Sequence, residues 1–286
     1  MALAFVPSDA GLLVLQAACV AAPRPAPKIA LFDRLGGRGW AIVPIASIVV
    51  VIFAIRYVSS TATGLTYLAL IAVPPLAAAA LGWACRGSTP WGAILAIPLF
   101  LLAWLDKTSL AGQAAGSILA ALSCVTLAVL LAAVTPPGWL KVGILLMAAA
   151  DSWLVLSDLL QAPNATLVAA APGGGLPQLQ NVPFGTAIMG YGDVFVAAVL
   201  GAVLARSSRE LQWRAALLTL VIAGLFDLLF FVLNELPATV PVALALIVVE
   251  VGGWLRRRRR SRAHASAERS RGRVFSDSGL ASKGGG

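Results

Sequence analysis

Aspartates within long apolar segments are the residues of this chain best placed to do chemistry. Asp151 lies in "LMAAADSWLVL", Asp193 in "AIMGYGDVFVAAVLGAVLA" and Asp227 in "GLFDLLFFVLN". An ionisable group inside a membrane costs about 3 kcal/mol or more, so a functional role is the default expectation for such residues. Glu250 also falls in an apolar segment, but near its end, where the carboxylate can reach the interface or pair with the arginines that follow.

The segments that carry these acids predict a polytopic membrane protein. The chain has 286 residues, of which 59% are hydrophobic and only 12% charged. A span needs about 20 apolar residues. About nine segments qualify, at 9–22, 40–57, 64–84, 90–105, 110–134, 138–160, 184–205, 213–234 and 236–255. We therefore expect an all-α bundle of about nine transmembrane helices. Residues 1–22 resemble a signal peptide in length, but no basic residue precedes the apolar run, which favours a retained span.

The distribution of basic residues predicts the orientation. With nine alternating spans, the basic loops and the tail share one side, and only Arg56 and Lys107 fall opposite. Basic residues stay cytoplasmic, which places the amino terminus outside and the carboxyl terminus inside. The Ala-, Gly- and Arg-rich composition and short loops favour a prokaryotic plasma membrane. Three parts follow: five spans in 1–137, four spans in 138–255, and a basic, disordered tail in 256–286 that is suited to anionic lipids.

Depth decides which acids can meet. Segment 138–160 runs outward and 184–205 runs inward, and each carries its aspartate about nine residues from the outer surface, or about 13 Å deep in a helix. Asp151 and Asp193 are therefore expected at the same level. Two carboxylates at close range share a proton, so one can take a proton from water while the other gives one to a leaving amine. Which of them is the base stays open. Asp227, at a similar expected depth, is interpreted as a supporting hydrogen-bond or packing residue.

Two further patterns accompany the acids. Gly190 and Gly192 flank Tyr191 just before Asp193, and glycine in this place either allows close helix packing or admits a substrate backbone beside the acid. In "NELPATVPVALALIVV" two prolines, Pro237 and Pro241, remove backbone donors at the start of the last span. This start is either an ordinary helix beginning with proline in its first turn or a stretch of free backbone groups for an extended substrate.

These three elements together resemble the presenilin and signal peptide peptidase family of intramembrane aspartyl proteases. That family has nine spans, an aspartate in span six, a G-x-G-D in span seven and a Pro-Ala-Leu motif at span nine. The likeness covers about residues 138–250. It implies a presenilin-like bundle that cleaves membrane-spanning or signal-peptide-like helices. Carried onto this sequence, the catalytic pair is Asp151 and Asp193, and the substrate-binding residues are Gly190, Tyr191, Gly192, Pro237, Ala238 and Thr239.

The sequence departs from that family at two positions and also fits other functions. Ala150 stands where the family usually has tyrosine, and Thr239 replaces leucine. The G-x-G-D segment also looks like that of type IV prepilin peptidases, but these usually carry a lysine where this chain has Phe195. The same aspartates would suit a proton-coupled transporter, and the basic tail would suit a structural membrane protein that binds lipid.

Several classes of partner are not expected. The only histidine, His264, lies in the tail, and the three cysteines are dispersed without C-x-x-C spacing. The composition therefore predicts no metal site and gives no sign of a cofactor. Because the basic residues follow the expected topology, nucleic acid is not an expected partner. The expected partners are the lipid bilayer and membrane-protein or signal-peptide substrates.

Overall fold

The chain is predominantly helical, as expected from its sequence. The computed structural model describes residues 2–25, 37–41, 46, 50, 61–157, 161–231, 236–255 and 258. The α-helices are α1 (Ala2–Ala21), α4 (Thr61–Ala79), α5 (Ala96–Leu105), α6 (Leu110–Val134), α7 (Pro137–Leu156), α8 (Gln161–Ala169), α9 (Tyr191–Ala205), α10 (Arg209–Phe226) and a last helix, Val240–Leu255. Shorter turns are η1 (Arg38–Ala41), the π-helix η2 (Ala80–Ala84), η3 (Pro90–Leu95), η4 (Gly173–Gly175) and η5 (Asp227–Phe231). Within these residues a two-stranded sheet joins β1 (Asn181–Phe184) to β2 (Ala187–Gly190).

The described helices include several that suit a membrane. Four are long and apolar enough to cross one: Thr61–Ala84, Leu110–Val134, Pro137–Leu156 and Arg209–Leu229. Four shorter apolar helices accompany them: Pro7–Ala21, Pro90–Leu105, Tyr191–Ala205 and Val240–Leu255. The span predicted at 40–57 and the tail at 256–286 lie almost entirely outside the described residues. The all-α class and the membrane character are supported, and the count of nine spans stays a prediction.

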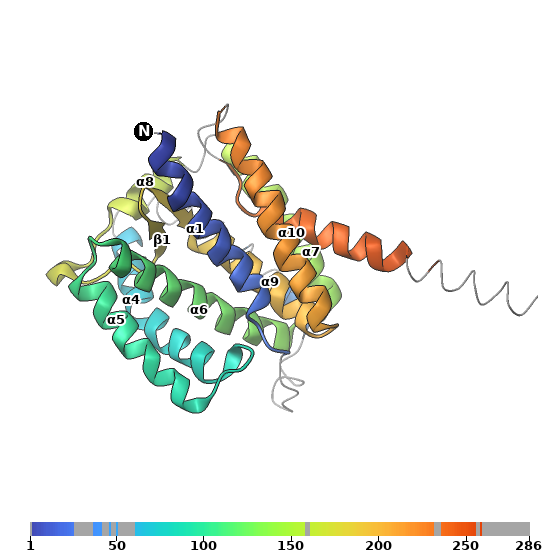
Figure 1. Cartoon of the computed structure of the whole chain (residues 1–286), viewed down its shortest axis with the longest axis horizontal. Coiled ribbons are helices and arrows are strands. Elements are labelled where there is room, and N and C mark those ends of the chain that lie inside the picture. Colours follow the sequence, from blue (N-terminus) through green and yellow to red (C-terminus); the bar gives the residue numbers. More distant parts are fainter. Residues whose placement is uncertain are drawn as a thin grey trace, which may run out of the picture. The chain divides into compact units, whose positions relative to one another are not determined.

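The helix α6 is central to the first of two compact units, which runs from Met1 to Leu246. Within the first unit α6 packs against α4, α5, α9 and β1, while α1 packs against α9 and α10 (Figure 1). Elements from before and after residue 137 therefore build one core together.

Small residues bring these helices close. A Cβ on Gly201 of α9 would lie 2.3 Å from the carbonyl oxygen of Val20 in α1, so the two backbones touch there. Close approach through small residues is how apolar helices associate when burial from water contributes little. Alanine fills much of the buried face of α6, including Ala115, Ala120 and Ala128. The first helix is thus fitted against the helix that carries Asp193.

A buried glutamine fixes the end of α1. Gln212 of α10 is fully buried, and its amide nitrogen donates to the carbonyls of Val20, Pro23 and Gly201 at 3.0, 2.9 and 3.2 Å. Its oxygen accepts from Nε of Arg86 at 2.8 Å. These bonds tie α1 to α9, α10 and Arg86 after η2, so the α1 helix is part of the folded core.

The span predicted at 184–205 is shorter in the structure. Its first residues form the antiparallel hairpin β1–β2, and the helix α9 begins only at Tyr191. The turn is Gly185–Thr186, and Gly185 has φ +61, a conformation that glycine adopts without the Cβ clash. Asp193 therefore lies in the first turn of a helix, and the prediction that it sits about nine residues into one is wrong.

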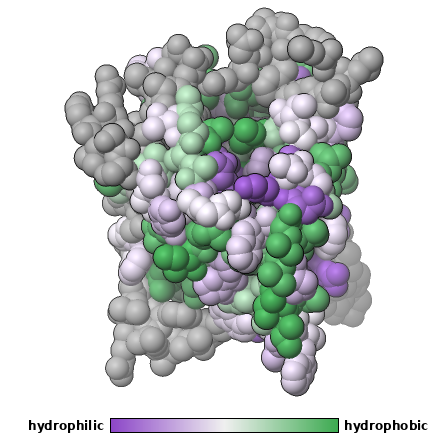
Figure 2. All heavy atoms as spheres, turned by 90° about the vertical axis from the view of Figure 1, so that its left-hand side faces the viewer, coloured by the Kyte–Doolittle hydropathy of each residue, from purple (hydrophilic) through white to green (hydrophobic). Residues whose placement is uncertain are grey.

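The connection before the hairpin is also structured. Residues 161–183, expected as a Pro- and Gly-rich loop, contain α8, η4 and the start of β1. Nζ of Lys107 donates to the carbonyl of Gly175 at 3.2 Å, and the amide of Gly173 donates to the hydroxyl of Tyr67 at 3.1 Å. Figure 2 shows the face that contains this end of the molecule, with hydrophilic side chains gathered near its centre and hydrophobic ones beside them.

Candidate active site

Asp193 is held by the start of its own helix. Gly190, with φ −68 and ψ 145, is the residue that caps α9, and its amide donates to Oδ2 of Asp193 at 3.2 Å. A carboxylate three residues after the cap commonly accepts this bond, and the positive end of the helix dipole favours its charge. This contact by itself is a capping interaction, so a catalytic role has to be argued from what else surrounds the carboxylate.

Asp151 receives two donors from the start of the last helix. It lies in α7, and its Oδ2 accepts a hydrogen bond from the Thr239 hydroxyl at 2.6 Å. The Thr239 amide lies 3.4 Å from the same oxygen. Thr239 is 3% exposed, so these donors reach Asp151 from the protein interior. The structure therefore joins two sequence-predicted site residues that are 88 positions apart.

The two acids lie on neighbouring helices. α7 packs against α9, and Asp151 is close enough to Asp193 for their charges to interact. Both side chains are half-buried. Carboxyl groups that come close enough to share a proton titrate together, and the state with one proton is then favoured over the doubly charged one. Such a state has one proton acceptor and one proton donor.

The glycine motif is exposed, and there is open space at Gly192. Both Gly190 and Gly192 are exposed, and a Cβ on Gly192 would meet nothing within 4 Å. Between them Tyr191 turns inward, where its hydroxyl is 2.7 Å from that of Ser123 in α6. The Sγ–H of Cys124 also contacts the Tyr191 carbonyl at 3.7 Å. Tyr191 thus anchors the motif to α6, whereas the two glycines are exposed at the surface.

The Pro-Ala-Thr tripeptide is a turn whose three carbonyl groups already accept hydrogen bonds within the protein. The carbonyl of Pro237 accepts from the amide of Val240, and that of Thr239 accepts from Ala243, each at 3.1 Å. The carbonyl of Ala238 accepts from the side chain of Gln16 at 2.9 Å. Pro241 falls in the first turn of the last helix, where its missing donor costs nothing. Of the two sequence interpretations, the ordinary helix start describes this segment.

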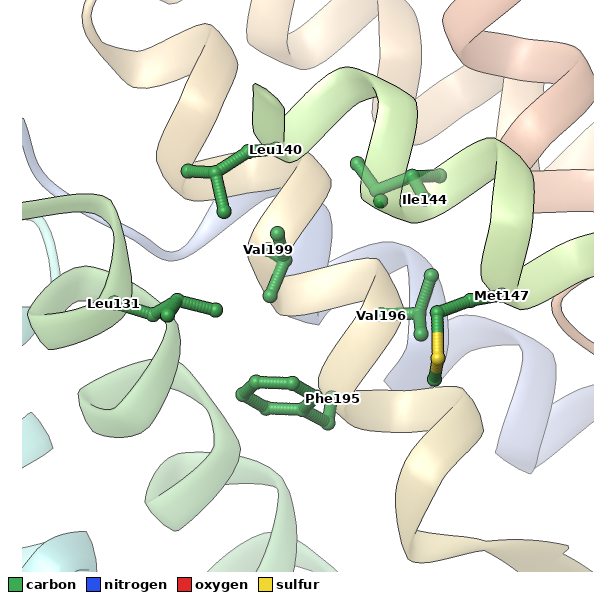
Figure 3. A pocket seen from close by; sticks show the side chains of 8 residues that line it. Leu131, Leu140, Ile144, Met147, Phe195, Val196 and Val199 are labelled. Carbon is green, nitrogen blue, oxygen red and sulfur yellow. The ribbon is translucent and has the colours of Figure 1, made fainter. Parts of the chain in front are cut away.

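An apolar hollow continues the seam between α7 and α9 (Figure 3). Met147 lies one helical turn before Asp151, and Val196 one turn after Asp193, so both are on the faces that carry the acids. Figure 3 shows Met147 beside Val196, while the ring of Phe195 projects from the other side of α9, toward Leu131. The full lining is Leu131, Leu140, Gly143, Ile144, Met147, Phe195, Val196 and Val199. Neither acid lines this hollow, and its free space is about the size of a water molecule, so it reflects apolar packing between α7 and α9.

Asp227 has a partner that sequence reasoning missed. It begins η5 after α10, and its carboxyl group hydrogen-bonds that of Asp9 in α1. Oδ2 of Asp9 is enclosed and has no hydrogen-bond partner among the described residues. Gln16 was also missed, although an amide in an otherwise apolar first span is a signal of a buried polar contact. Within the described ranges no group of histidines, cysteines and acids is arranged to hold a metal ion.

The geometry stands without support from relatives. None of the known protein families, curated proteins or solved structures that were compared with this chain matches it.

Proposed function

We propose that this chain is an intramembrane aspartic endopeptidase of the presenilin and signal peptide peptidase type. The observation that carries the proposal is the placement of Asp151 and Asp193 on adjacent apolar helices, close enough for their charges to interact, with the exposed Gly192 directly before Asp193. A helix cap alone would explain Asp193, but it would not explain a second half-buried carboxylate close to it.

The pair supplies both halves of peptide hydrolysis. The ionised carboxylate removes a proton from a water molecule, whose oxygen attacks the carbonyl carbon of the peptide bond. The protonated carboxyl group then donates its proton to the amide nitrogen, and the C–N bond breaks to give a free acid and a free amine. Because the proton is shared, the pair rather than either residue holds these roles.

The hairpin provides an edge for an extended substrate. Pro183 pairs with Ile188 in the β1–β2 register, and proline has no amide hydrogen, so this pair is a non-hydrogen-bonded one. The amide and carbonyl of Ile188 therefore point to the outer edge of β2, which pairs with β1 alone among the described strands. A peptide that added to this edge would run toward Gly190 and the acids. It would have to be unwound, because backbone groups inside a helix are already bonded.

The surroundings favour membrane-embedded substrates. The helices that carry the acids, α7 and α9, are apolar themselves. The ends of α1, η2, α9 and α10 lie together through Gln212 and Arg86, and the basic loops predicted as cytoplasmic start at these ends. A multi-pass plasma-membrane protein with the amino terminus outside is consistent with that grouping, and suits substrate helices whose amino termini lie inside.

Purified protein in detergent or vesicles tests the proposal directly. A single-span peptide and a signal-peptide-like helix are incubated with the protein, and new termini are identified by mass spectrometry. Asp193→Asn and Asp151→Asn should each abolish cleavage, and a transition-state mimic of peptide hydrolysis should inhibit the wild type. Glu210→Gln is the matched control, because Glu210 is exposed and pairs with Arg214 in the adjacent turn of its own helix. Cleavage that survives both aspartate substitutions would disprove the assignment.

The same assay separates the related protease class. A type IV prepilin leader peptide, offered beside the other two substrates, reports prepilin peptidase activity by cleavage at the leader junction. Phe195 stands where those enzymes usually carry a lysine, which argues against this class.

A proton-coupled transporter is the second candidate, and the Asp9–Asp227 contact favours it. A second pair of carboxyl groups, away from the helix start that carries Asp193, is what a proton relay would use. A transporter predicts solute uptake into vesicles driven by a pH gradient, lost in Asp227→Asn, and no effect of the transition-state mimic.

A further inference from the structure

Gln16 of α1 is a buried amide within an apolar helix. Its side chain is 1% exposed, and Nε2 donates to the carbonyl oxygen of Ala238 at 2.9 Å. The two residues are 222 positions apart in the sequence. A buried amide is costly unless it is hydrogen-bonded, so this contact accounts for how the fold accommodates the side chain.

The bond fixes one end of a peptide unit whose other end faces the candidate active site. The carbonyl of Ala238 and the amide of Thr239 belong to the same planar peptide group, and in a trans peptide they point in opposite directions. Gln16 holds the carbonyl end, while the amide end lies 3.4 Å from Oδ2 of Asp151. The Thr239 hydroxyl follows on the same residue and reaches that oxygen at 2.6 Å.

We propose that Gln16 is a positioning residue for Asp151, an inference that rests on the proposed protease function. By anchoring the Ala238–Thr239 peptide, it keeps both Thr239 donors on the Asp151 carboxylate. Gln16 acts through this peptide group and not through a hydrogen bond of its own to Asp151. The first helix is accordingly part of the active-site architecture, through one side-chain amide.

The fold offers a matched control for this role. Gln212 is also a fully buried glutamine that ties α1 to the core, through carbonyls of Val20, Pro23 and Gly201. None of these three bonds involves the Pro-Ala-Thr turn. A loss of stability alone should therefore follow from changing Gln212, whereas changing Gln16 should also alter the chemical step.

The first experiment compares Gln16→Met with Gln212→Met, because methionine keeps the length and volume of glutamine without its donor. In the purified protease Gln16→Met should lower kcat by about 3- to 10-fold with KM unchanged, as expected for one lost hydrogen bond. Gln212→Met should lower the thermal midpoint at least as much and leave kcat at the wild-type value. An unchanged kcat in Gln16→Met, with cleavage by the wild type intact, would overturn the inference and leave the proposed function standing.

A double-mutant cycle tests whether Gln16 acts through Thr239. Thr239→Val removes the hydroxyl, and adding Gln16→Met should then cause much less than its own single-mutant loss. Gln212→Met combined with Thr239→Val should show no such coupling. Full multiplication of the Gln16 and Thr239 effects on kcat would contradict the relay.

Hydrogen exchange gives a readout that needs no activity. Gln16→Met should speed exchange at the Thr239 amide, measured by mass spectrometry of the segment after Pro237, and Gln212→Met should not. If the wild type cleaves no peptide, the proposed function fails. The exchange measurement still shows whether Gln16 holds the Ala238–Thr239 peptide group. Should Gln16→Met not fold, Gln16→Asn, which stays polar but is one methylene shorter, replaces it in every assay. Unchanged exchange in the Gln16 variants would refute the positioning role.

Discussion

Two pairs of interacting carboxyl groups lie in the described part of the chain, and their surroundings differ. Asp151 and Asp193 each accept hydrogen bonds from the backbone or a side chain, and two exposed glycines, Gly190 and Gly192, precede Asp193. Asp227 and Asp9 contact each other, and Oδ2 of Asp9 is enclosed with no donor from the described residues. The Asp151–Asp193 pair is held by hydrogen bonds and lies next to exposed glycines. The Asp9–Asp227 pair has one oxygen that is buried from solvent.

The difference shows why a buried acid alone does not define a catalytic site. A hydrolytic pair needs fixed carboxylates, a proton shared between them, and a route for a peptide and a water molecule. The Asp151–Asp193 pair has the donors and the space, whereas a carboxyl–carboxyl hydrogen bond can join α1 to α10 with no substrate at all. Substitutions in and around the two pairs should therefore have different effects on activity.

Removing the carboxylates should separate the two pairs most strongly. Asp151→Asn and Asp193→Asn should each lower kcat by about 100- to 10,000-fold, because general acid–base catalysis requires a transferable proton. Asp9→Asn and Asp227→Asn retain a hydrogen-bonding side chain and should keep most of the activity. Initial rates on a single-span peptide measure all four. Equal losses in both pairs would remove the distinction between them.

The Thr239 hydroxyl, which donates to Asp151, should have the next largest effect on kcat. Thr239→Val removes a donor to a carboxylate while preserving the shape of the side chain, and hydrogen bonds to charged groups contribute about 1.5–3 kcal/mol. We expect kcat to fall by about 10- to 100-fold, and Thr239→Ser, which keeps the hydroxyl, to restore most of it. Circular dichroism should show both variants folded. If serine and valine behave alike, Thr239 acts by packing and not through its hydroxyl.

A substitution at the outer edge of β2 should have a smaller effect on activity. Ile188→Pro removes the outward amide without breaking a β1–β2 bond, since position 188 belongs to a non-hydrogen-bonded pair. The loss of one backbone bond to substrate should lower kcat/KM by about fivefold. Ile188→Ala keeps the amide and serves as the control for the lost side chain, which is 55% exposed. A drop in alanine as large as in proline would assign the effect to the side chain.

The helical membrane fold and the Asp151–Asp193 pair were predictable from the sequence, because charged residues within apolar segments are a strong signal. The pattern predicted an all-α membrane protein and singled out Asp151, Asp193 and Thr239, which the structure brings to one place. It did not predict the hairpin, since an apolar run of this length also fits a helix. The signals were Pro183, which cannot donate within a sheet, and Gly185 at the turn.

The contacts of α1 could not be predicted in the same way. Asp9 and Gln16 lie in the first segment, while their partners Asp227 and Ala238 lie more than 200 residues later. Periodicity and composition report which face of a helix is apolar, but not which distant element covers it. Only the packing of α1 on α9 and α10 decides that, and it depends on close backbone contacts such as Gly201 against Val20.

A substitution at Gly192 should have the smallest effect on activity, and it tests whether the substrate approaches beside Asp193. Alanine fits there because its Cβ would meet nothing within 4 Å, and a glycine in a helix is about 1 kcal/mol less favourable than alanine. Gly192→Ala should therefore leave the thermal midpoint unchanged or raise it. If the open space beside Asp193 receives the substrate backbone, the added methyl group should raise KM by about threefold with little change in kcat. Gly224→Ala, on α10 and equally unobstructed, is the matched control and should leave KM unaltered. A stabilised Gly192→Ala with wild-type KM would mean that this space is not the approach to the acid pair, and that the exposure of Asp193 reflects only its place at a helix start.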